Sequence, residues 1–281
     1  MDVPSYPPPV DKLLTLGDGR EVAGTMNQWS TYLELGLGPE HIPDLIRMAT
    51  DEELRWAYSD TLEVWAPIHA WRALGQLRAE AAIEPLFSLF EESKDDEWVM
   101  DELPEIYGMI GPAAIPALTA YLADDSHLDE TRITAISCLE KIGTIHPEAR
   151  AECVAVLSRQ LEAYKENDPE VNAFLISHLI DLKALEAAPV IERAFAADRV
   201  YLDIAGDWDD VQIELGLKSP GEVLQTQYRT LFDASAQSMT EERVASPGLS
   251  YSEPSRKRNV APNKARRKMV KQSRKKNRKH K

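Results

Sequence analysis

The sequence is poor in cysteine and contains no recognisable catalytic motif. Only Cys138 and Cys153 occur among its 281 residues, and neither has a second cysteine or a histidine at metal-site spacing. A disulfide scaffold and a structural zinc site are therefore excluded, and a reducing, cytoplasmic setting fits. Both cysteines fall at apolar positions of helical patterns, so we expect them to pack in the core. No glycine-rich segment is followed by a phosphate-binding lysine, and we expect no cofactor and no metal.

The sequence also lacks a secretory signal and an unbroken apolar segment long enough to span a membrane. The N-terminus has no positively charged region, and residues 4–9 include four prolines. Residues 106–123 carry no charge, but a Gly-Pro pair at 111–112 and a further proline interrupt them. We therefore expect two helices joined by a turn at this point, in a soluble protein with no transmembrane segment.

Charge is distributed very unevenly along the chain. The whole sequence has 32 basic and 47 acidic residues, a net charge of −15. Residues 254–281 hold 14 of the basic residues and no acidic one, which leaves 18 basic against 47 acidic residues in 1–253. The body of the protein therefore carries −29 and the tail +14.

Short segments of similar sequence recur along the chain. They centre on Leu45, Leu86, Leu118, Leu157 and Ile191, at spacings of 41, 32, 39 and 34 residues. A unit that recurs at such intervals is typical of a helical solenoid.

Each unit has the pattern of two amphipathic helices separated by a break. An apolar stripe at three- and four-residue spacing comes first, as in 62–77 and 99–110. A glycine then marks the expected break, and a second helix follows with proline in its first turn. Because such a pair cannot bury both apolar faces alone, we predict an all-α, right-handed α-solenoid of about five stacked helix pairs. The predicted breaks are Gly38, Gly75, Gly111 and Gly143, and the predicted first-turn prolines are Pro43, Pro85, Pro116 and Pro189.

These units resemble a known class of repeat. Residues 73–77 (ALGQL) with 82–86 (AIEPL), and 110–118 (IGPAAIPAL), resemble HEAT-like repeats of the short, phycobilisome-lyase type. Residues 27–217 more broadly resemble an uncharacterised bacterial HEAT-like family, most distinctly over 194–217. The resemblance implies the fold but no particular partner, because such repeats serve many partners. Some members of that family end in a cysteine-rich SEC-C zinc motif, which cannot be carried over because no cysteine follows Cys153.

The composition divides the chain into five parts. We expect a proline-containing lead (1–26), the HEAT-like solenoid (27–217), a docking helix (218–233), a linker (234–255) and a basic tail (256–281).

Acidic residues gather between the predicted helices, at 51–53, 91–92, 95–97, 101–102 and 124–125. Carboxylates at helix starts cap free N–H groups, which explains many of them. The alternative is that some share one face and bind a basic partner.

A short acidic loop near the end of the predicted solenoid is a candidate binding edge. The calcium-loop spacing is absent there, so a capped terminal turn with the tryptophan packed beneath it is the simpler interpretation. The candidate residues are Asp203, Asp207, Trp208, Asp209 and Asp210.

Aromatic residues crowd residues 56–107, where helical spacing favours core packing over a groove for a partner helix. Histidines are scattered singly, and we expect packed or capping residues rather than catalytic bases. The tryptophans and tyrosines in this range are Trp56, Tyr58, Trp65, Trp71, Trp98 and Tyr107, and the histidines before the basic tail are His41, His69, His127, His146 and His178.

The basic tail is the sharpest feature of the sequence. Like-charge repulsion and few apolar residues predict that it is disordered when free. It could neutralise many phosphates and so bind RNA, for example ribosomal RNA, in a strongly salt-dependent manner. The alternatives are a solubilising tail, contact with an anionic membrane, a strap on the acidic body, or a nuclear address. The candidate phosphate- or RNA-binding residues are Arg256, Lys257, Arg258, Lys264, Arg266, Arg267, Lys268, Lys271, Arg274, Lys275, Lys276, Arg278 and Lys279.

The sequence favours a non-enzymatic, cytoplasmic interaction scaffold. Its solenoid surface would hold a protein partner, while the tail adds electrostatic affinity for RNA or a ribonucleoprotein. The alternative from the resemblance is an enzyme or enzyme subunit of the phycobilisome-lyase type that handles a bilin chromophore. We can place no catalytic residue for it. A third interpretation is an adaptor inhibited by its own tail.

Overall fold

The computed structural model describes residues 5–19, 29, 31–57, 61–92 and 97–226. The described residues are helical and contain no β-strand, so the all-α prediction is confirmed. The chain divides into two compact units, residues 1–199 and 200–281. The predicted linker and basic tail, and residues 227–233 of the predicted docking helix, lie outside the described residues.

Helices of one to five turns follow one another along the chain. The first unit contains α1 (Ile42–Ala49), α2 (Glu52–Arg55), α3 (Ala66–Gln76), α4 (Phe87–Glu92), α5 (Glu97–Ile110), α6 (Ile115–Ala123), α7 (Asp129–Ile145), α8 (Arg150–Glu162), α9 (Pro169–Asp181) and α10 (Ala188–Ala196). The second unit contains α11 (Leu202–Ala205) and α12 (Trp208–Glu214), and helical structure resumes from Pro220 to Thr226. Short 3-10 helices are η1 (Val10–Thr15), η4 (Tyr32–Leu35), η5 (Pro39–His41), η6 (Glu63–Trp65), η7 (Glu80–Ala82), η8 (Pro112–Ala114) and η9 (Leu185–Ala187).

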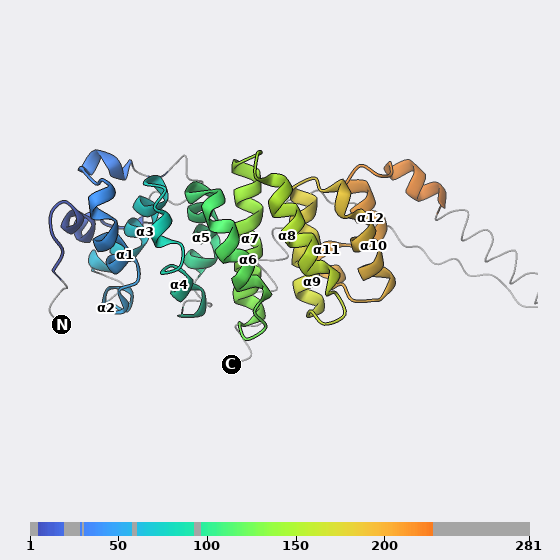
Figure 1. The fold of residues 1–281 in the computed structure, drawn as a ribbon, viewed down its shortest axis with the longest axis horizontal. Coiled ribbons are helices and arrows are strands. Elements are labelled where there is room, and N and C mark those ends of the chain that lie inside the picture. Colours follow the sequence, from blue (N-terminus) through green and yellow to red (C-terminus); the bar gives the residue numbers. More distant parts are fainter. Residues whose placement is uncertain (1–4, 20–28, 30, 58–60, 93–96, 227–281) are drawn as a thin grey trace, which may run out of the picture. The chain divides into compact units, whose positions relative to one another are not determined.

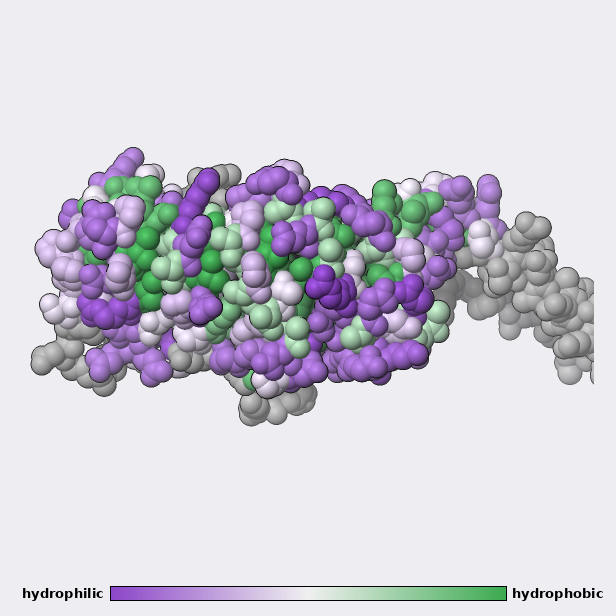
Figure 2. Space-filling model, in the orientation of Figure 1, coloured by the Kyte–Doolittle hydropathy of each residue, from purple (hydrophilic) through white to green (hydrophobic). Residues whose placement is uncertain are grey.

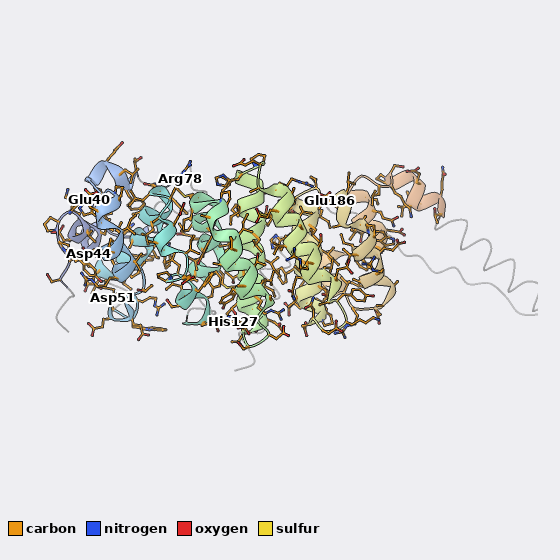
Figure 3. All side chains as sticks on the ribbon, viewed as in Figure 1. Glu40, Asp44, Asp51, Arg78, His127 and Glu186 are labelled. Atoms are coloured by element: carbon orange, nitrogen blue, oxygen red, sulfur yellow. The ribbon has the colours of Figure 1, made fainter. Side chains whose placement is uncertain are left out.

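The helices of the first unit pack in chain order. Helix α1 packs on α3, α3 on α5, α5 on α7, and α7 on both α8 and α9 (Figure 1). The connecting loops alternate between two edges. Asp51 and His127 lie along one edge and Arg78 and Glu186 along the other (Figure 3). The predicted amphipathic stripes supply the buried faces at Ala73, Leu103 and Ile106, which are fully buried. The stripe predicted over 62–77 is wrong at Leu62, which precedes α3 and is 51% exposed.

Proline begins several of these helices. Pro43, Pro116 and Pro189 stand in the first turns of α1, α6 and α10, as predicted, because the first N–H groups of a helix have no internal partner. Pro85 differs, since it lies two residues before α4 begins.

No single helix among the described residues is long and apolar enough to span a membrane. Residues 99–110 and 112–123 meet that criterion only together, and they are bent by 110° at their junction. The predicted break in the charge-free segment is therefore confirmed, and Gly111 makes it with φ +93°.

Two predicted glycine breaks are wrong. Gly75 lies inside α3 and Gly143 inside α7, and both mark close approach between neighbouring elements. A Cβ atom on Gly75 would lie 3.2 Å from Ile106 Cδ1, and one on Gly143 would lie 2.9 Å from Leu182 Cδ2. The third, Gly38, has extended backbone (φ −139°) and precedes a 3-10 turn instead of ending a helix.

The first unit closes three of its helices at residues other than glycine. Arg78, Lys183 and Asp198 each adopt positive φ two residues after α3, α9 and α10. The next amide donates to a carbonyl five residues back in every case, from Ala79, Ala184 and Arg199. This is the Schellman closure, which usually takes glycine, so a search for glycine could not find it.

Side chains packed around the N-terminal segment bury a connected polar cluster. Tyr6, Val10 and Leu13 are buried, so residues 5–19 belong to the core of the first unit. His69 Nε2 donates to the Gly17 carbonyl (2.9 Å), which can only accept, so His69 Nδ1 accepts from the Tyr32 hydroxyl (2.8 Å). Burial lowers the pKa of His69 and keeps it neutral.

A buried ion pair joins α3 to α5. Arg72 and Glu102 are buried, and Arg72 Nε donates to Glu102 Oε2 at 2.8 Å while Arg72 Nη2 contacts Glu102 Oε1. Trp71 Nε1 donates to the same carboxylate (3.1 Å). The Arg72 guanidinium also lies 5.1 Å from the ring centroid of Trp29. These contacts satisfy charges that would otherwise be costly to bury.

The cysteines are buried as predicted, but the predicted aromatic core residues are not all buried. Cys138 and Cys153 are free and buried, as expected. Trp71 and Tyr107 are buried, whereas Trp65 is half-buried and Trp56 is 78% exposed, so core packing of Trp56 is wrong. Trp56 is the C-cap residue of α2, and Leu54 is the residue that this helix buries. Tyr58 and the Trp98 side chain lie outside the described residues. Hydrophilic side chains cover most of the face in Figure 2, with hydrophobic ones between them.

Replacing Glu102 by alanine should lower the free energy of unfolding by about 3–5 kcal/mol, because it leaves the buried Arg72 charge without its partner. Urea unfolding at pH 7 measures the change. Asp101→Ala, on the exposed side of the same helix, is the matched control and should stay within about 0.5 kcal/mol of the parent. Equal effects from the two substitutions would contradict a stabilising role for the pair.

Candidate acidic pocket

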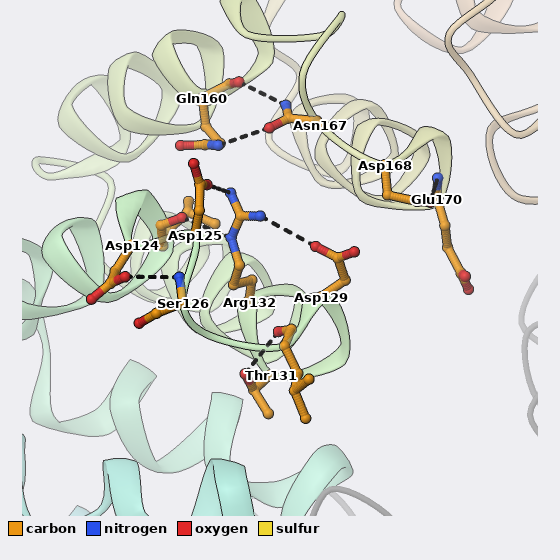
Figure 4. A network of polar contacts seen from close by, with 12 residues as sticks. Asp124, Asp125, Ser126, Asp129, Thr131, Arg132, Gln160, Asn167, Asp168 and Glu170 are labelled. Atoms are coloured by element: carbon orange, nitrogen blue, oxygen red, sulfur yellow. Dashed lines mark hydrogen bonds and ion pairs between the residues drawn. The ribbon is translucent and has the colours of Figure 1, made fainter.

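A cavity of about 600 Å³ opens where two inter-helix loops of the first unit meet. One wall comes from the end of α6, the following loop and the start of α7. The other comes from the end of α8, the loop before α9, and Arg199 (Figure 4). We call this cavity the acidic pocket. Its lining residues are Ala123, Asp125, Asp129, Arg132, Gln160, Ala163, Glu166, Asn167, Asp168 and Arg199.

Arg132 forms the base of the acidic pocket. It is only 4% exposed, and its Nε donates to the Leu122 carbonyl at 3.0 Å. Its Nη1 donates to Asp129 Oδ1 at 3.2 Å. Its Nη2 is buried and has no hydrogen-bond partner, although Asp125 Oδ1 lies 3.4 Å away in an ion pair. The Asp125 side chain itself is 89% exposed.

The opposite wall is fixed by a network of amides. Asn167 is buried, and its Nδ2 donates to the Gln160 carbonyl and to Asn172 Oδ1, both at 2.9 Å. Asn172 Nδ2 in turn donates to the carbonyls of Tyr164 and Arg199, both at 2.8 Å. The loop between α8 and α9 is therefore held on both sides by side chains rather than by solvent.

Arg199 and Asp168 complete the wall. Arg199 Nη2 donates to the Asn167 carbonyl at 2.8 Å. Asp168 accepts from the Glu170 amide at 2.8 Å and so caps the N-terminus of α9.

The lining has an excess of negative charge. It includes four carboxylates, Asp125, Asp129, Glu166 and Asp168, against two guanidinium groups, for a formal charge of −2. No histidine, cysteine, serine or threonine belongs to the described lining. The acidic pocket can therefore hold a cation and donate to an acceptor, but it offers no nucleophile beyond its carboxylates.

The acidic pocket brings together residues that are far apart in the sequence. Asp125 and Glu166 are 41 residues apart, and Asp129 and Asp168 are 39 apart. The segment that leads into α7 and the loop before α9 supply these carboxylates. Of these residues, only Asp125 belonged to a predicted acidic cluster. One feature of the sequence could have indicated that Arg132 is buried. It lies on the apolar stripe of α7, three and four residues before the buried Ala135 and Ile136.

A second polar cluster surrounds Glu91 on α4. Glu91 Oε1 accepts from the Tyr121 hydroxyl (2.5 Å) and lies 3.0 Å from His127 Nδ1. Thr131 Oγ1 lies 3.2 Å from the same oxygen and 2.8 Å from the Leu128 carbonyl, and it can donate its single proton to only one of them at a time. The His127 ring stacks on Tyr121 with centroids 3.8 Å apart. Burial raises the pKa of Glu91, but these hydrogen bonds outweigh it and hold the pKa below its ordinary value. The cluster joins α4, α6 and α7.

A serine and a histidine meet between α7 and α9. Ser137 Oγ lies 3.1 Å from His178 Nε2 and 3.1 Å from the Ile133 carbonyl, and a hydroxyl has only one proton to donate. Asp181 Oδ2 is 3.7 Å from His178 Nδ1, longer than a hydrogen bond. This geometry bridges two helices and does not make a catalytic triad.

The other predicted residues have structural partners or lie outside the described residues. His41 Nδ1 accepts from the Gly38 amide, and His146 Nε2 donates to the Gly108 carbonyl, so these histidines cap and pack as expected. Asp51 caps α2. The basic residues of the tail, from Arg256 to Lys279, lie outside the described residues.

The acidic loop 203–210 of the second unit is built around a capping box. Asp207 accepts from the Asp210 amide (2.9 Å), and Asp210 accepts from the Asp207 amide (3.1 Å). Trp208 is half-buried and Asp203 is exposed. No group of three potential metal ligands occurs in the described ranges. The capped turn is confirmed, while binding at this edge stays a prediction.

No protein-family model, no curated protein and no solved structure matches the chain. The resemblance to HEAT-like repeats therefore stays a prediction.

Replacing Glu91 by glutamine should lower the free energy of unfolding at pH 7 by about 0.5–1 kcal/mol, discounted for partial exposure. Because the folded pKa is depressed, the contribution is complete above the ordinary glutamate pKa and is lost as pH falls through the folded value. The difference between parent and variant should therefore shrink in acid. Urea unfolding between pH 3 and 7 measures it, with the exposed Glu84→Gln as control. A difference that does not vary with pH would contradict this account.

Proposed function

We propose that the chain is a non-enzymatic interaction scaffold. In this proposal the helices form a right-handed solenoid of about five HEAT-like pairs, whose surface binds a protein partner in the cytoplasm. The basic tail adds electrostatic affinity for RNA or a ribonucleoprotein.

The packing order of the first unit supports the solenoid. Helix α1 packs on α3, α3 on α5, α5 on α7 and α7 on α9, and the loops alternate between two edges (Figures 1 and 3). The closures at Arg78 and Lys183 also repeat, since each is followed by an alanine and a 3-10 turn, η7 or η9. Recurring closures with nearest-neighbour packing are typical of solenoid proteins.

The acidic pocket carries the proposal of a protein partner. It is a polar cavity formed by two loops of successive units, with a buried arginine at its base and carboxylates at its rim. Solenoids commonly bind through such rows of equivalent loops. The described lining offers groups for recognition rather than for covalent chemistry, which favours a scaffold over an enzyme.

The tail's role rests on its sequence. Thirteen candidate contacts to phosphate within 256–281 would give sequence-independent binding that weakens steeply with salt. A weak contact at the tail and another at the helical surface can combine through effective concentration. No observation among the described residues favours the bilin-handling alternative.

Affinity capture from a lysate tests both halves of the proposal. Full-length protein and residues 1–253 are each used at low and high salt, and the bound RNA and protein are identified. We expect RNA with the full-length chain at low salt only, and the same protein partner with both forms. RNA bound equally by residues 1–253 would contradict the role of the tail. Absence of a protein partner common to both forms would contradict the scaffold.

A further inference from the structure

We propose that the acidic pocket binds a lysine- or arginine-bearing segment of the partner protein. The cationic side chain faces the rim carboxylates, and a backbone carbonyl of the same segment accepts a hydrogen bond from Arg132. This inference rests on the proposed function, because it names the chemistry that the scaffold recognises.

Charge selects a cation over an anion. The formal charge of the lining is −2, and the Arg132 charge already faces Asp129 at 3.2 Å and Asp125 at 3.4 Å. An anion entering the cavity would meet four carboxylates. Glu166 and Asp125 are exposed and can be reached from solvent. The net charge of −29 on residues 1–253 would also attract a basic segment from a distance.

Arg132 favours a bound segment that places a hydrogen-bond acceptor next to its cationic side chain. Guanidinium groups have five N–H donors, and a buried donor without an acceptor is costly. Arg132 Nη2 makes no hydrogen bond, and its one close acceptor is Asp125 Oδ1, at 3.4 Å in an ion pair. Because the Asp125 side chain is 89% exposed, it can turn toward a bound cation and leave Nη2 to an incoming acceptor.

A peptide supplies both features within one or two residues. A simple amine provides the cation but not the carbonyl, and a metal ion has no set of three ligands in the described ranges. The cavity of about 600 Å³ suits a few side chains. The wall held by Asn167 and Asn172 is already ordered, which lowers the cost of binding.

The first experiment measures binding of a basic peptide to the full-length, nuclease-treated protein. The probe is a fluorescein-labelled dodecapeptide with four lysines among glycines and serines, followed by anisotropy at constant salt. The double variant Asp125→Asn/Glu166→Gln should bind it about tenfold more weakly, as loss of two surface ion pairs predicts. Both residues are exposed, so circular dichroism should show an unchanged fold.

The matched control is Glu84→Gln/Glu192→Gln, which removes the same charge from exposed positions outside the lining. It should bind within about twofold of the parent, since surface charges away from the site act only through screened, long-range attraction. Equal losses in the two double variants, or no loss in the pocket variant, would overturn the proposal.

The second experiment tests the carbonyl. Spermine carries four positive charges, like the peptide, but has no carbonyl group. We expect about tenfold more spermine than unlabelled peptide to be needed for equal displacement of the probe, because a hydrogen bond from a charged donor is lost. Equal potency of the two competitors would overturn the role of Arg132.

Failure here can be separated from failure of the scaffold. If lysate capture yields a protein partner but the pocket variant keeps peptide binding, this inference fails and the scaffold stands. If the peptide binds in the acidic pocket but no protein is captured, the scaffold fails and the acidic pocket stands.

Discussion

Packing between every second helix, from α1 through α3, α5 and α7 to α9, is the contact on which the first unit depends. Helix α3 packs on α1 and α5, α5 packs on α3 and α7, and α7 packs on α5 and α9. Close approach requires small residues at the crossing points, and Gly75 and Gly143 occupy two of them. A short helix pair could not bury these faces alone. The spacing between loops, and so the position of every loop side chain, follows from this packing.

Buried charge gives the packing its specificity. Arg72 and Glu102 fix α3 against α5, and their partners Trp71 and Trp29 complete the cluster. Arg132 is the contrasting case, because it is also buried but its Nη2 makes no hydrogen bond and pairs only with the exposed Asp125. A buried, hydrogen-bonded pair stabilises the helices, whereas a donor beside a cavity that makes no hydrogen bond is a position where a ligand can supply an acceptor.

Much of the fold could be predicted from the sequence, because helix periodicity and proline position are local signals. The breaks were harder. Glycine takes the positive φ at Gly111, but at Arg78 and Lys183 other residues take a positive φ within closure bonds that composition does not reveal. The apolar stripes in the sequence were enough to predict the fold class, whereas the ends of the helices could be assigned only from the hydrogen bonds in the structure.

The candidate site was less accessible from sequence. The acidic clusters could be identified in the sequence, but the sequence does not distinguish an acidic residue that caps a helix from one that lines a binding pocket. Asp207 is a cap, whereas Asp125 lies at the rim of the acidic pocket. Only the packing of α7 on α8 and α9 brings residues about 40 positions apart into one cavity. A charged residue on an apolar helix stripe, as at Arg132 and Glu102, was the one local feature of the sequence that indicated a buried polar site.

Amide hydrogen exchange of the full-length protein, with and without the lysine dodecapeptide, tests the central claim most directly. The account predicts that saturating peptide slows exchange in residues 122–132 and 160–168, which form the two walls of the acidic pocket. Exchange elsewhere in the described part of residues 5–199 should change little. Unchanged exchange in both walls, or equal slowing over all acidic loops, would contradict a specific site for a basic segment.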